Sequence, residues 1–400
     1  MLSVKDAQSK IAKLLTPVGS ETVGISDVGG RVLVAPAVAL RDQPPFAASA
    51  MDGYAILKSD LNARATLSVI GEISAGNFNP LSVASGQAVR IFTGAPLPEH
   101  ADHILIQEDA ERTGDTITIK EGFESQSYVR PAGGDFKKGF ELSAPRRLSA
   151  SDVALLASMN VPKIRVSRRP VVSIIPTGDE LVWPGDTPAP DQIIASNNFG
   201  LKAMLEAEGA DVRLLPIAPD TTTGLTQLFD LTEGSDLIIT LGGASVGDHD
   251  LVQSVAKAEG LDLSFYKLAM RPGKPLMAGL LRGIPMIGLP GNPVSSMVCA
   301  QIFIKPAIRA LCGLGYQSDP IYQAKLDTDI GPNGPREHYM RARVKAGPDG
   351  WICSPFERQD SSLLSILSDA NALMIRPAHD PAQTAGAVVD FTHIERFHMV

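Results

Sequence analysis

The chain has 400 residues, which is too many for a single hydrophobic core, so we expect two to four domains. Hydrophobic residues make up 44% of the chain and charged residues 20%, as is usual for a soluble globular protein. The formal net charge of -8 argues against nucleic acid or an anionic membrane as the main partner, although a local basic patch could still bind a small anion.

The cysteines and the N-terminal segment indicate the compartment. Cys299, Cys312 and Cys353 are scattered without C-x-x-C spacing, which argues against a disulfide framework or a zinc site and fits a reducing environment. The segment MLSVKDAQSKIAKLL lacks an apolar core of signal-peptide length, and we expect no run of membrane-span length. A cytoplasmic protein is therefore expected.

The first part of the chain predicts a helical and strand region interrupted by a β domain. Residues 1–15 have helical periodicity, with Ala7 and Ile11 on one apolar face. Short β-type runs alternate with Gly, Pro and Asn turns over 44–135, which indicates an inserted β domain. A helix follows, with Ser149 or Ser151 as its N-cap. Residues 1–43 and 136–169 then form one segmented domain.

Residues 170–317 have the pattern of an α/β domain. Buried-strand runs such as PVVSIIP and DLIITLGG alternate with amphipathic helices, two of which end at Gly209 and Gly260. The alternation predicts a doubly wound, mostly parallel sheet, followed by a long apolar helix from Pro293. Residues 318–400 return to β-type runs and predict a closing C-terminal β domain.

Polar residues fall where the predicted parallel strands end, and ligands of such sheets bind beyond that edge. The segments are TGDEL (177–181), Asp220, LGGASVGDHD (241–250), RPGKP (271–275) and GNPVS (291–295). The loop GGASVG lacks the lysine of a Walker loop and the G-x-G-x-x-G spacing of a dinucleotide site. Its glycines permit close backbone approach of a ligand.

An acidic set and a basic set lie in these loops. The acidic residues are Asp179, Glu180, Asp220, Asp248 and Asp250, which are either helix caps and solvated loop residues or, together, a Mg2+–phosphate site. The basic residues are Lys267, Arg271 and Lys274, in a loop stiffened by prolines. They are either solvated or arranged to bind an oxyanion. Asn292 and Ser295 either cap the last helix or bring an anion to its N-terminus.

Three segments of the insertion read as turns when taken alone: SAMDGYA (49–55), RIFTGAPLP (90–98) and RPAGGDFKKG (130–139). Together with the α/β loops, however, the ordered motifs resemble the MoeA family of molybdopterin molybdenumtransferases, which includes the C-terminal part of gephyrin. The resemblance extends from PFAASAMDGYA to LLSILSDANALMIRP, nearly the whole chain.

The resemblance implies a four-domain fold, with a molybdopterin-binding α/β domain and a C-terminal β-barrel-like domain, in an elongated homodimer. It implies insertion of molybdate into adenylated molybdopterin, with Mg2+ and release of AMP. The active site would lie between the α/β domain of one subunit and the insertion of the other. A transient contact with a molybdopterin adenylyltransferase is also expected.

Matching positions give the implied site residues. Those of the insertion are Asp52, Thr93 and Asp135, and those of the acidic rim, also the implied Mg2+ ligands, are Glu180, Asp220 and Asp250. The implied substrate-binding residues are Gly242, Gly243, Ser245, Gly247, Asp248, Lys267, Arg271, Lys274, Pro290, Asn292, Pro293 and Ser295. The chain departs from the family pattern at Ala47-Ala48, at Gly134 and at Arg271, where the family often has Asp-Asn, Glu and Lys.

Two other functions fit the same pattern. One is an ATP-dependent molybdopterin adenylyltransferase, since such enzymes share the α/β core. The other is a non-catalytic, gephyrin-like scaffold. Turnover of ATP without molybdate insertion would indicate the first, and binding of pterin or peptide without dependence on molybdate would indicate the second.

Overall fold

The computed structural model describes residues 1–76, 80–242 and 251–394. The chain divides into two compact units: Thr22–Arg165, called the smaller unit below, and Met1–Glu21 with Val166–Val400, called the larger unit. Each is described by itself.

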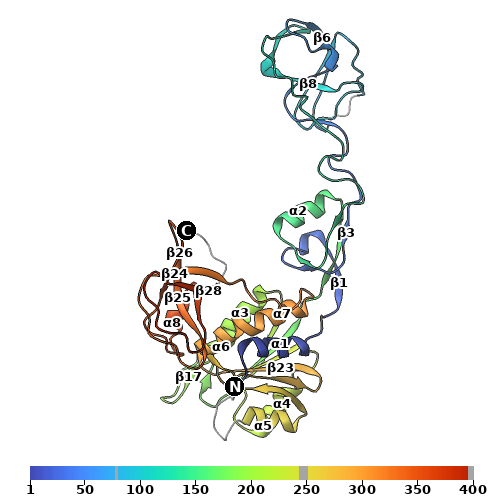
Figure 1. Cartoon of the computed structure of the whole chain (residues 1–400). Helices are drawn as coiled ribbons and strands as arrows, with labels where there is room; N and C mark the ends of the chain where they lie inside the picture. The colour runs from blue at the N-terminus through green and yellow to red at the C-terminus, as the bar shows by residue number, and fades with distance from the viewer. Residues whose placement is uncertain (77–79, 243–250, 395–400) are drawn as a thin grey trace. The chain divides into compact units, whose positions relative to one another are not determined.

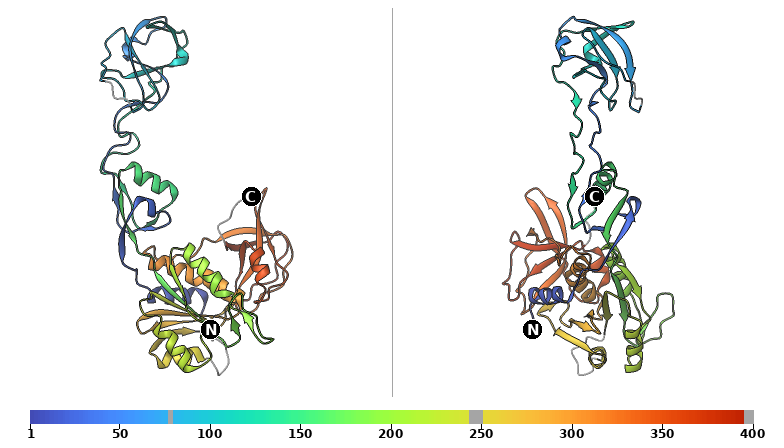
Figure 2. Two further views of the ribbon diagram at one scale, coloured as in Figure 1. Left: turned by 180° about the vertical axis from the view of Figure 1, so that it is seen from behind. Right: turned by 90° about the vertical axis from the view of Figure 1, so that its right-hand side faces the viewer.

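The smaller unit contains a six-stranded sheet, which Figure 2 shows from two sides. Apolar residues pack on both of its faces. In spatial order its strands are β8 (His103–Ile106), β5 (Gly53–Ile56), β7 (Gln87–Ile91), β6 (Thr66–Ile73), β10 (Thr116–Ile119) and β9 (Ala110–Thr113). Tyr54 and Ile56 belong to one apolar cluster and Ala55 to the other, because neighbouring residues of a strand point to opposite faces. The β-type runs predicted in this region are therefore strands.

Shorter elements complete this part of the chain. Helix α2 (Ala150–Ser158) begins with a capping box: Ser149 Oγ accepts the Asp152 N–H at 3.2 Å, and Asp152 Oδ2 accepts the Ser149 N–H at 2.9 Å. Ser149, and not Ser151, is thus the N-cap. The remaining strands are β1 (Ser20–Gly24), β14 (Lys163–Ser167), β2 (Val32–Leu33) and β13 (Arg146–Arg147) in one sheet, and the pairs β3 (Ala37–Val38) with β12 (Glu141–Leu142) and β4 (Ala48–Ser49) with β11 (Val129–Arg130). The 3-10 turns are Ile25–Asp27, Lys58–Asp60 and Gln107–Asp109.

The larger unit is built on a buried six-stranded sheet. Its spatial order is β18 (Asp211–Leu214), β15 (Val171–Pro176), β19 (Leu237–Leu241), β23 (Ile284–Leu289), β22 (Met277–Leu281) and β20 (Leu261–Tyr266). The first four are parallel and β22 runs antiparallel to both of its neighbours. The predicted mostly parallel sheet is confirmed. After β18 at the edge, the chain returns to the other side of β15, so β15 and β19 flank a topological switch point.

Helices cover both faces of this sheet (Figure 1). The helices α1 (Val4–Leu14), α3 (Asn197–Ala207), α6 (Pro293–Cys299) and α7 (Lys305–Leu311) lie on one side, and α4 (Thr222–Asp230) and α5 (Leu251–Ala258) on the other. The N-terminal helix, which the sequence placed in the segmented domain, contacts β20, β22 and α7. Helix α4 is capped by Thr221, whose Oγ1 accepts the Gly224 N–H at 3.1 Å. Asp220 is therefore not the N-cap.

The predicted long apolar helix is present but is interrupted by a π-helical turn at Ala300–Ile304, between α6 and α7. Pro306 lacks an N–H, so it cannot donate to the Ile302 carbonyl one turn earlier. Gln8 Nε2 of α1 donates to this carbonyl instead, at 3.3 Å. By length and composition Pro293–Leu311 could cross a membrane, which makes the expectation of no such run wrong. Because 83% of its apolar window is buried inside the protein, it is a core helix.

A five-stranded barrel closes the described chain. Strands β25 (Glu337–Gly347), β26 (Gly350–Pro355), β24 (Tyr322–Leu326), β28 (Val388–His393) and β27 (Ala372–Arg376) pair in this order, and β27 closes onto β25. Helix α8 (Leu364–Asp369) contacts β25 and α6, and β21 (Met270–Arg271) pairs with β25. The short pair β16 (Leu181–Val182) and β17 (Ile193–Ile194) follows β15.

Candidate functional site

A cavity of about 920 Å³ opens at the carboxyl edge of the α/β sheet, at its switch point. Its lining includes the residues that follow four parallel strands: Thr177 after β15, Asp220 beyond β18, Gly242 after β19 and Pro290 after β23. The strand-end loops expected to meet at one edge are therefore brought together around one space. The volume lies within the range of small-molecule sites.

Two of the glycines in the lining are required by the backbone. Gly242 has φ +93°, and a Cβ there would lie 2.8 Å from the Thr177 carbonyl oxygen. Gly178 has φ +136°, and a Cβ there would collide with the Glu180 carboxylate. Residues other than glycine rarely adopt such φ angles. The two loops can therefore approach each other closely only with bare backbone at these positions.

The acidic rim is formed by Glu180 and Asp220, which are both exposed and both line the cavity. Asp179 has a different task, because its Oδ1 accepts the Asp220 N–H at 3.0 Å and so holds that loop in place. Two carboxylates beside a phosphate are a donor set that suits Mg2+, which takes one or two carboxylates and fills its other positions with water and phosphate oxygens. Among the described residues, no group of three His, Cys, Asp or Glu could hold a metal.

The predicted residues Gly243, Ser245, Gly247, Asp248 and Asp250 lie outside the described part of the chain. Their roles stay predictions from the sequence.

The first turn of α6 forms another wall through Gly291, Asn292 and Pro293. Asn292 is the N-cap residue, but its side chain does not cap: Nδ2 donates to Ser361 Oγ at 2.9 Å. The Val294 N–H donates to the Ser361 carbonyl at 3.0 Å, and Ser295 in the same turn is buried. Pro293 has no N–H and the Val294 N–H is already used, so the Ser295 N–H is the group of this turn that could bind an anion.

The basic loop after β20 is fixed to both the sheet and the barrel. Pro275 lines the cavity, whereas Lys267, Arg271 and Lys274 are not among the lining residues. The Leu268 N–H donates to the Lys274 carbonyl at 2.9 Å, and β21 pairs with β25. Arg271 is exposed, and Lys267 Nζ lies 4.7 Å from the centre of the Tyr266 ring. Contact of these cations with a ligand stays a prediction.

Arg341 of β25 is a candidate residue that the sequence did not identify. Its side chain is completely buried, and Nη2 donates to the Asp360 carbonyl at 2.8 Å, next to Ser361. Within the described residues, Nε and Nη1 have no partner. Burial, and then the charge of Arg271, lower the pKa of Arg341 to about 10, so the guanidinium is still charged at neutral pH. A buried cation with free N–H groups is costly unless an anion pairs with it.

The pattern HYMRARV gave no signal for this role, because arginines on a strand usually point to solvent.

In the smaller unit the structure brings Asp52 and Thr93 together. Asp52 Oδ1 accepts the Thr93 N–H at 2.7 Å and the Thr93 Oγ1–H at 2.8 Å. These two hydrogen bonds hold the pKa of Asp52 below its usual value, with a smaller contribution from Arg90. Asp135 lies at a different turn, where its N–H donates to the Gln43 carbonyl at 2.9 Å and the residue is exposed.

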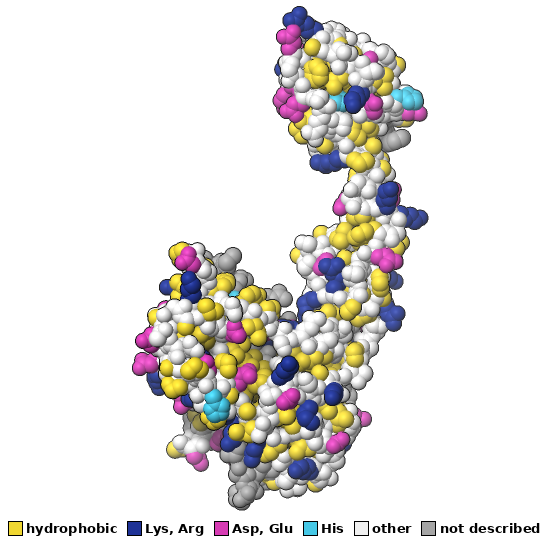
Figure 3. Space-filling view, in the orientation of Figure 1, with side chains coloured by type: hydrophobic (Ala, Val, Ile, Leu, Met, Phe, Trp, Pro, Cys, Tyr) yellow, Lys and Arg dark blue, Asp and Glu magenta, His cyan; other side chains and the backbone are white. Residues whose placement is uncertain are grey.

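On the face of the larger unit shown in Figure 3, basic, acidic and hydrophobic side chains are interspersed. On this face the affinity for a charged ligand must therefore come from local groups rather than from a broad surface of one sign. A parallel α/β sheet with a cavity at its switch point, carboxylates on one rim and a helix N-terminus on another is the arrangement of a ligand-binding α/β domain.

Comparison with known proteins identifies the family. Residues 2–160 match the "MoeA N-terminal region (domain I and II)", 173–310 the "Probable molybdopterin binding domain" and 323–394 the "MoeA C-terminal region (domain IV)". The chain belongs to the MoeA family.

Relatives and a solved structure cover most of the chain. The Haemophilus influenzae protein named molybdopterin molybdenumtransferase is 36% identical over 98% of this chain and 100% of its own length. A protein of the same name from Nostoc sp. is 34% identical over 85% of this chain and 81% of its own. The molybdopterin biosynthesis MoeA protein of Pyrococcus horikoshii has a similar structure, with a TM-score of 0.84 and 25% identity over 98% of this chain and 100% of that one.

Proposed function

We propose that this protein is a molybdopterin molybdenumtransferase that inserts molybdate into adenylated molybdopterin, releases AMP and requires Mg2+. The observation that carries the proposal is the switch-point cavity, which combines Glu180 and Asp220 with the first turn of α6. Family membership and the names of the relatives support the transferase activity.

The acidic rim is where we place the metal. Glu180 and Asp220 would hold Mg2+ together with the diphosphate of the substrate, and Asp250 is a third predicted ligand. Bound Mg2+ would neutralise the diphosphate and polarise its phosphorus–oxygen bonds. The Asp179 carboxylate positions Asp220 by accepting a hydrogen bond from the backbone N–H of Asp220. The acids therefore serve the phosphate end of the substrate rather than acting as nucleophiles.

The positive groups on the other side of the site serve the molybdate. Molybdate and the diphosphate are both anions and repel each other, so their approach requires fixed positive charge. The Ser295 N–H at the start of α6 would supply partial positive charge, and the buried guanidinium of Arg341 would supply a full charge nearby. Val294, next to Ser295, and Arg341 both donate to carbonyls of residues 360–361, so one segment holds both groups. Lys274 and Arg271 add positive charge from the neighbouring loop. Catalysis would come mainly from positioning and electrostatics, without a covalent intermediate.

We further propose, on the family resemblance, that the active protein is a homodimer in the cytoplasm that receives its substrate from an adenylyltransferase. The pair Asp52–Thr93 and Asp135 of one subunit would then complete the site of the other. The Asp52 carboxylate is kept ionised by Thr93, which suits a residue that accepts hydrogen bonds from a ligand.

The direct test is incubation with adenylated molybdopterin, Mg2+ and molybdate, following both AMP release and cofactor formation. Asp220→Asn keeps the backbone N–H that Asp179 holds but removes the charge. We expect AMP release to fall at least about tenfold, equivalent to about 1.4 kcal/mol in the barrier. The Mg2+ concentration needed for half-maximal rate should rise.

The matched control is Asp191→Asn, an exposed carboxylate of the same domain that does not line the cavity. It should keep the wild-type rate and Mg2+ dependence. Wild-type AMP release by both Asp220→Asn and Glu180→Gln would refute the assigned role of the acidic rim. Turnover of ATP without cofactor formation would instead identify an adenylyltransferase.

A further inference from the structure

A second cavity, of about 750 Å³, lies between α3, the α6–π segment and the barrel. Its apolar walls come from α3, α6, α8 and the barrel. Gly200, Ala203, Met204 and Ala207 are on α3, Met297 and Val298 on α6, and Leu364, Leu367, Leu373 and Ile394 on or next to the barrel. Gly200 brings the helices close together, since a Cβ there would lie 3.1 Å from Met297 Sδ. The cavity has the size and the mainly apolar lining of a small-molecule site.

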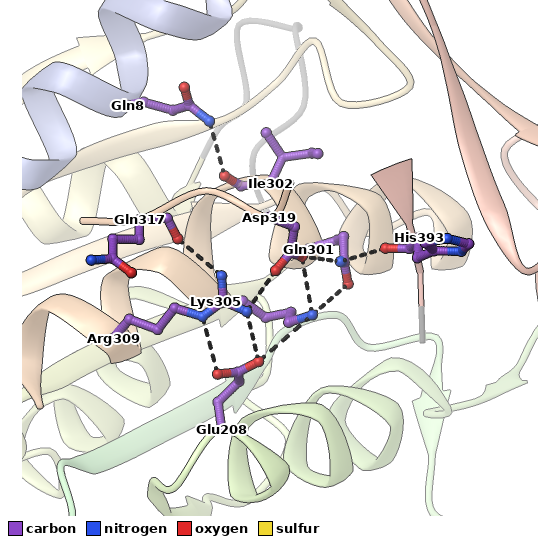
Figure 4. A network of polar contacts seen from close by, with 9 residues as sticks. All are labelled: Gln8, Glu208, Gln301, Ile302, Lys305, Arg309, Gln317, Asp319 and His393. Carbon is purple, nitrogen blue, oxygen red and sulfur yellow. Dashed lines mark hydrogen bonds and ion pairs between the residues drawn. The ribbon is translucent and has the colours of Figure 1, made fainter. Parts of the chain in front are cut away.

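The polar end of this cavity belongs to a network of ion pairs and hydrogen bonds (Figure 4). Glu208, Gln301 and Lys305 line it. Arg309 binds the Glu208 carboxylate with two hydrogen bonds, from Nη2 to Oε1 at 3.0 Å and from Nε to Oε2 at 3.2 Å. Its Nη2 also donates to Asp319 Oδ1 at 2.6 Å. Lys305 Nζ lies 3.1 Å from Asp319 Oδ2 and 3.6 Å from Glu208 Oε1. Two carboxylates thus neutralise two cations, with each of the four side chains at most 17% exposed.

This end of the cavity favours a neutral ligand with a polar edge. Because all four charges are already paired with one another, they offer no net attraction that would offset the desolvation of an anion or a cation. Gln301 is 2% exposed, and from the described residues its Oε1 receives only a long contact of 3.4 Å, from Lys305 Nζ. A carbonyl oxygen has two lone pairs, so it can still accept a hydrogen bond from a ring amino group.

The walls favour a flat ring. Met204 and Met297 both line the cavity, and a thioether sulfur makes favourable contacts with aromatic rings. Small residues along α3 leave room for a ring face against the helix. Apolar walls with a hydrogen-bonding end match a neutral heteroaromatic ring, such as a purine or a pterin.

The cavity adjoins the candidate active site, because Ser196 and Asn197 line both spaces. Asn197 Nδ2 donates to the Gly291 carbonyl at 2.7 Å, next to the first turn of α6. We propose that this second cavity binds one heteroaromatic ring of the adenylated pterin substrate while its diphosphate lies in the first cavity. The proposal rests on the proposed function, which gives the substrate two such rings, adenine and pterin, on either side of the diphosphate.

The test is direct binding of two probes, AMP and the free pterin neopterin, to the full chain with 13C-labelled methionine methyl groups. A bound ring shifts nearby methyl signals through its ring current. We expect one probe to shift the signals of Met204 and Met297, which are assigned with Met204→Leu and Met297→Leu. The probe that does so identifies the ring as adenine or pterin. If neither probe binds, or if both bind without moving these two signals, the proposal is wrong.

A filling variant gives the second readout. Ala203→Phe occupies the cavity from an exposed helix position, and Ala203→Ser is the matched control that leaves it open. Ala203→Phe should bind the probe that shifts the Met204 and Met297 signals at least about tenfold more weakly than the wild type, whereas Ala203→Ser should bind it normally. Both variants should keep wild-type affinity for inorganic pyrophosphate, which probes the first cavity. Wild-type affinity of Ala203→Phe for both AMP and neopterin would overturn the proposal. Because these are binding measurements, their outcome is independent of whether the wild-type protein inserts molybdate.

Discussion

Replacing Gly273 by alanine should displace the basic loop that carries Arg271 and Lys274. Gly273 has φ +110°, and a Cβ at this position would lie 2.4 Å from Sγ of the completely buried Cys299 of α6. Real Cβ atoms essentially never come so close to another atom, so either the sulfur or the loop must move. We expect the loop to move rather than the sulfur, because Cys299 is completely buried in the core helix.

The expected loss of stability has two sources. Forcing extra volume into a packed core costs about 1–3 kcal/mol. The left-handed backbone of Gly273 adds about 1–3 kcal/mol of strain for alanine. Cys299→Ala removes the sulfur and so relieves the first cost but not the second. The double variant should therefore be more stable than the sum of the single changes by at least about 1 kcal/mol.

Urea unfolding followed by tryptophan fluorescence measures this difference. The chain has two tryptophans, Trp183 and Trp351, and both belong to the larger unit, so the signal reports on the unit that contains Gly273. Gly283→Ala is the matched control: Gly283 has φ +81° with open space around its Cβ position, and it should show the strain alone. In a molybdate-binding measurement, Gly273→Ala should bind more weakly than wild type and the double variant should recover.

Additive effects of Gly273→Ala and Cys299→Ala, within about 0.5 kcal/mol, would refute the steric reasoning. So would an equal loss of stability for Gly273→Ala and Gly283→Ala, since only the former meets a neighbouring atom.

Three further results are expected. Thr93→Val should raise the pKa of Asp52 toward its ordinary value in an NMR titration, because one of the two hydrogen bonds that lower it is removed. In the wild type, these two hydrogen bonds stabilise the folded protein above about pH 3.8, and the stabilisation is lost as the pH falls through the lowered pKa of Asp52. Burial lowers the pKa of His103, so in the wild type stability should fall as the pH drops below about 6.5, and His103→Leu should lose this dependence in calorimetric unfolding. Arg309→Met removes one of the two cations of the buried ion network, so that Lys305 alone has to balance Glu208 and Asp319, and it should destabilise the larger unit by about 3 kcal/mol in the urea assay. Arg343→Met, at an exposed ion pair, should change the stability by less than about 1 kcal/mol.

Much of the fold could be predicted because the spacing of apolar residues and the positions of glycines determine helices, strands and turns from neighbouring residues alone. The runs PVVSIIP and DLIIT fall on the strands Val171–Pro176 and Leu237–Leu241, whose centres are fully buried, and Gly209 ends α3 with φ +99°. The meeting of the strand-end loops followed from a general rule for parallel sheets. These features depend on a few neighbouring residues, so sequence alone was sufficient.

The parts that could not be predicted depend on residues far apart in the chain. Thr221 rather than Asp220 caps α4, and Asp220 instead receives support from Asp179, 41 positions away. The burial of Arg341 depends on how the barrel packs around it, and its strand pattern does not reveal this. The π-helical turn depends on Pro306, but its stability also depends on Gln8 from the first helix.

Helix α6 and its π-helical extension connect these observations. Its first turn faces the first cavity and is held by Ser361, while Cys299 at its end supports the loop of Arg271 and Lys274. Gln301 in the π turn then lines the second cavity. The anion-binding turn, the basic loop and the second cavity therefore share one rigid, buried element, so a shift of this helix would misplace all three at once. The helix is apolar enough to resemble a membrane span because most of it packs in the core, and this packing fixes the positions of its few polar groups, among them Gln301, at the two cavities.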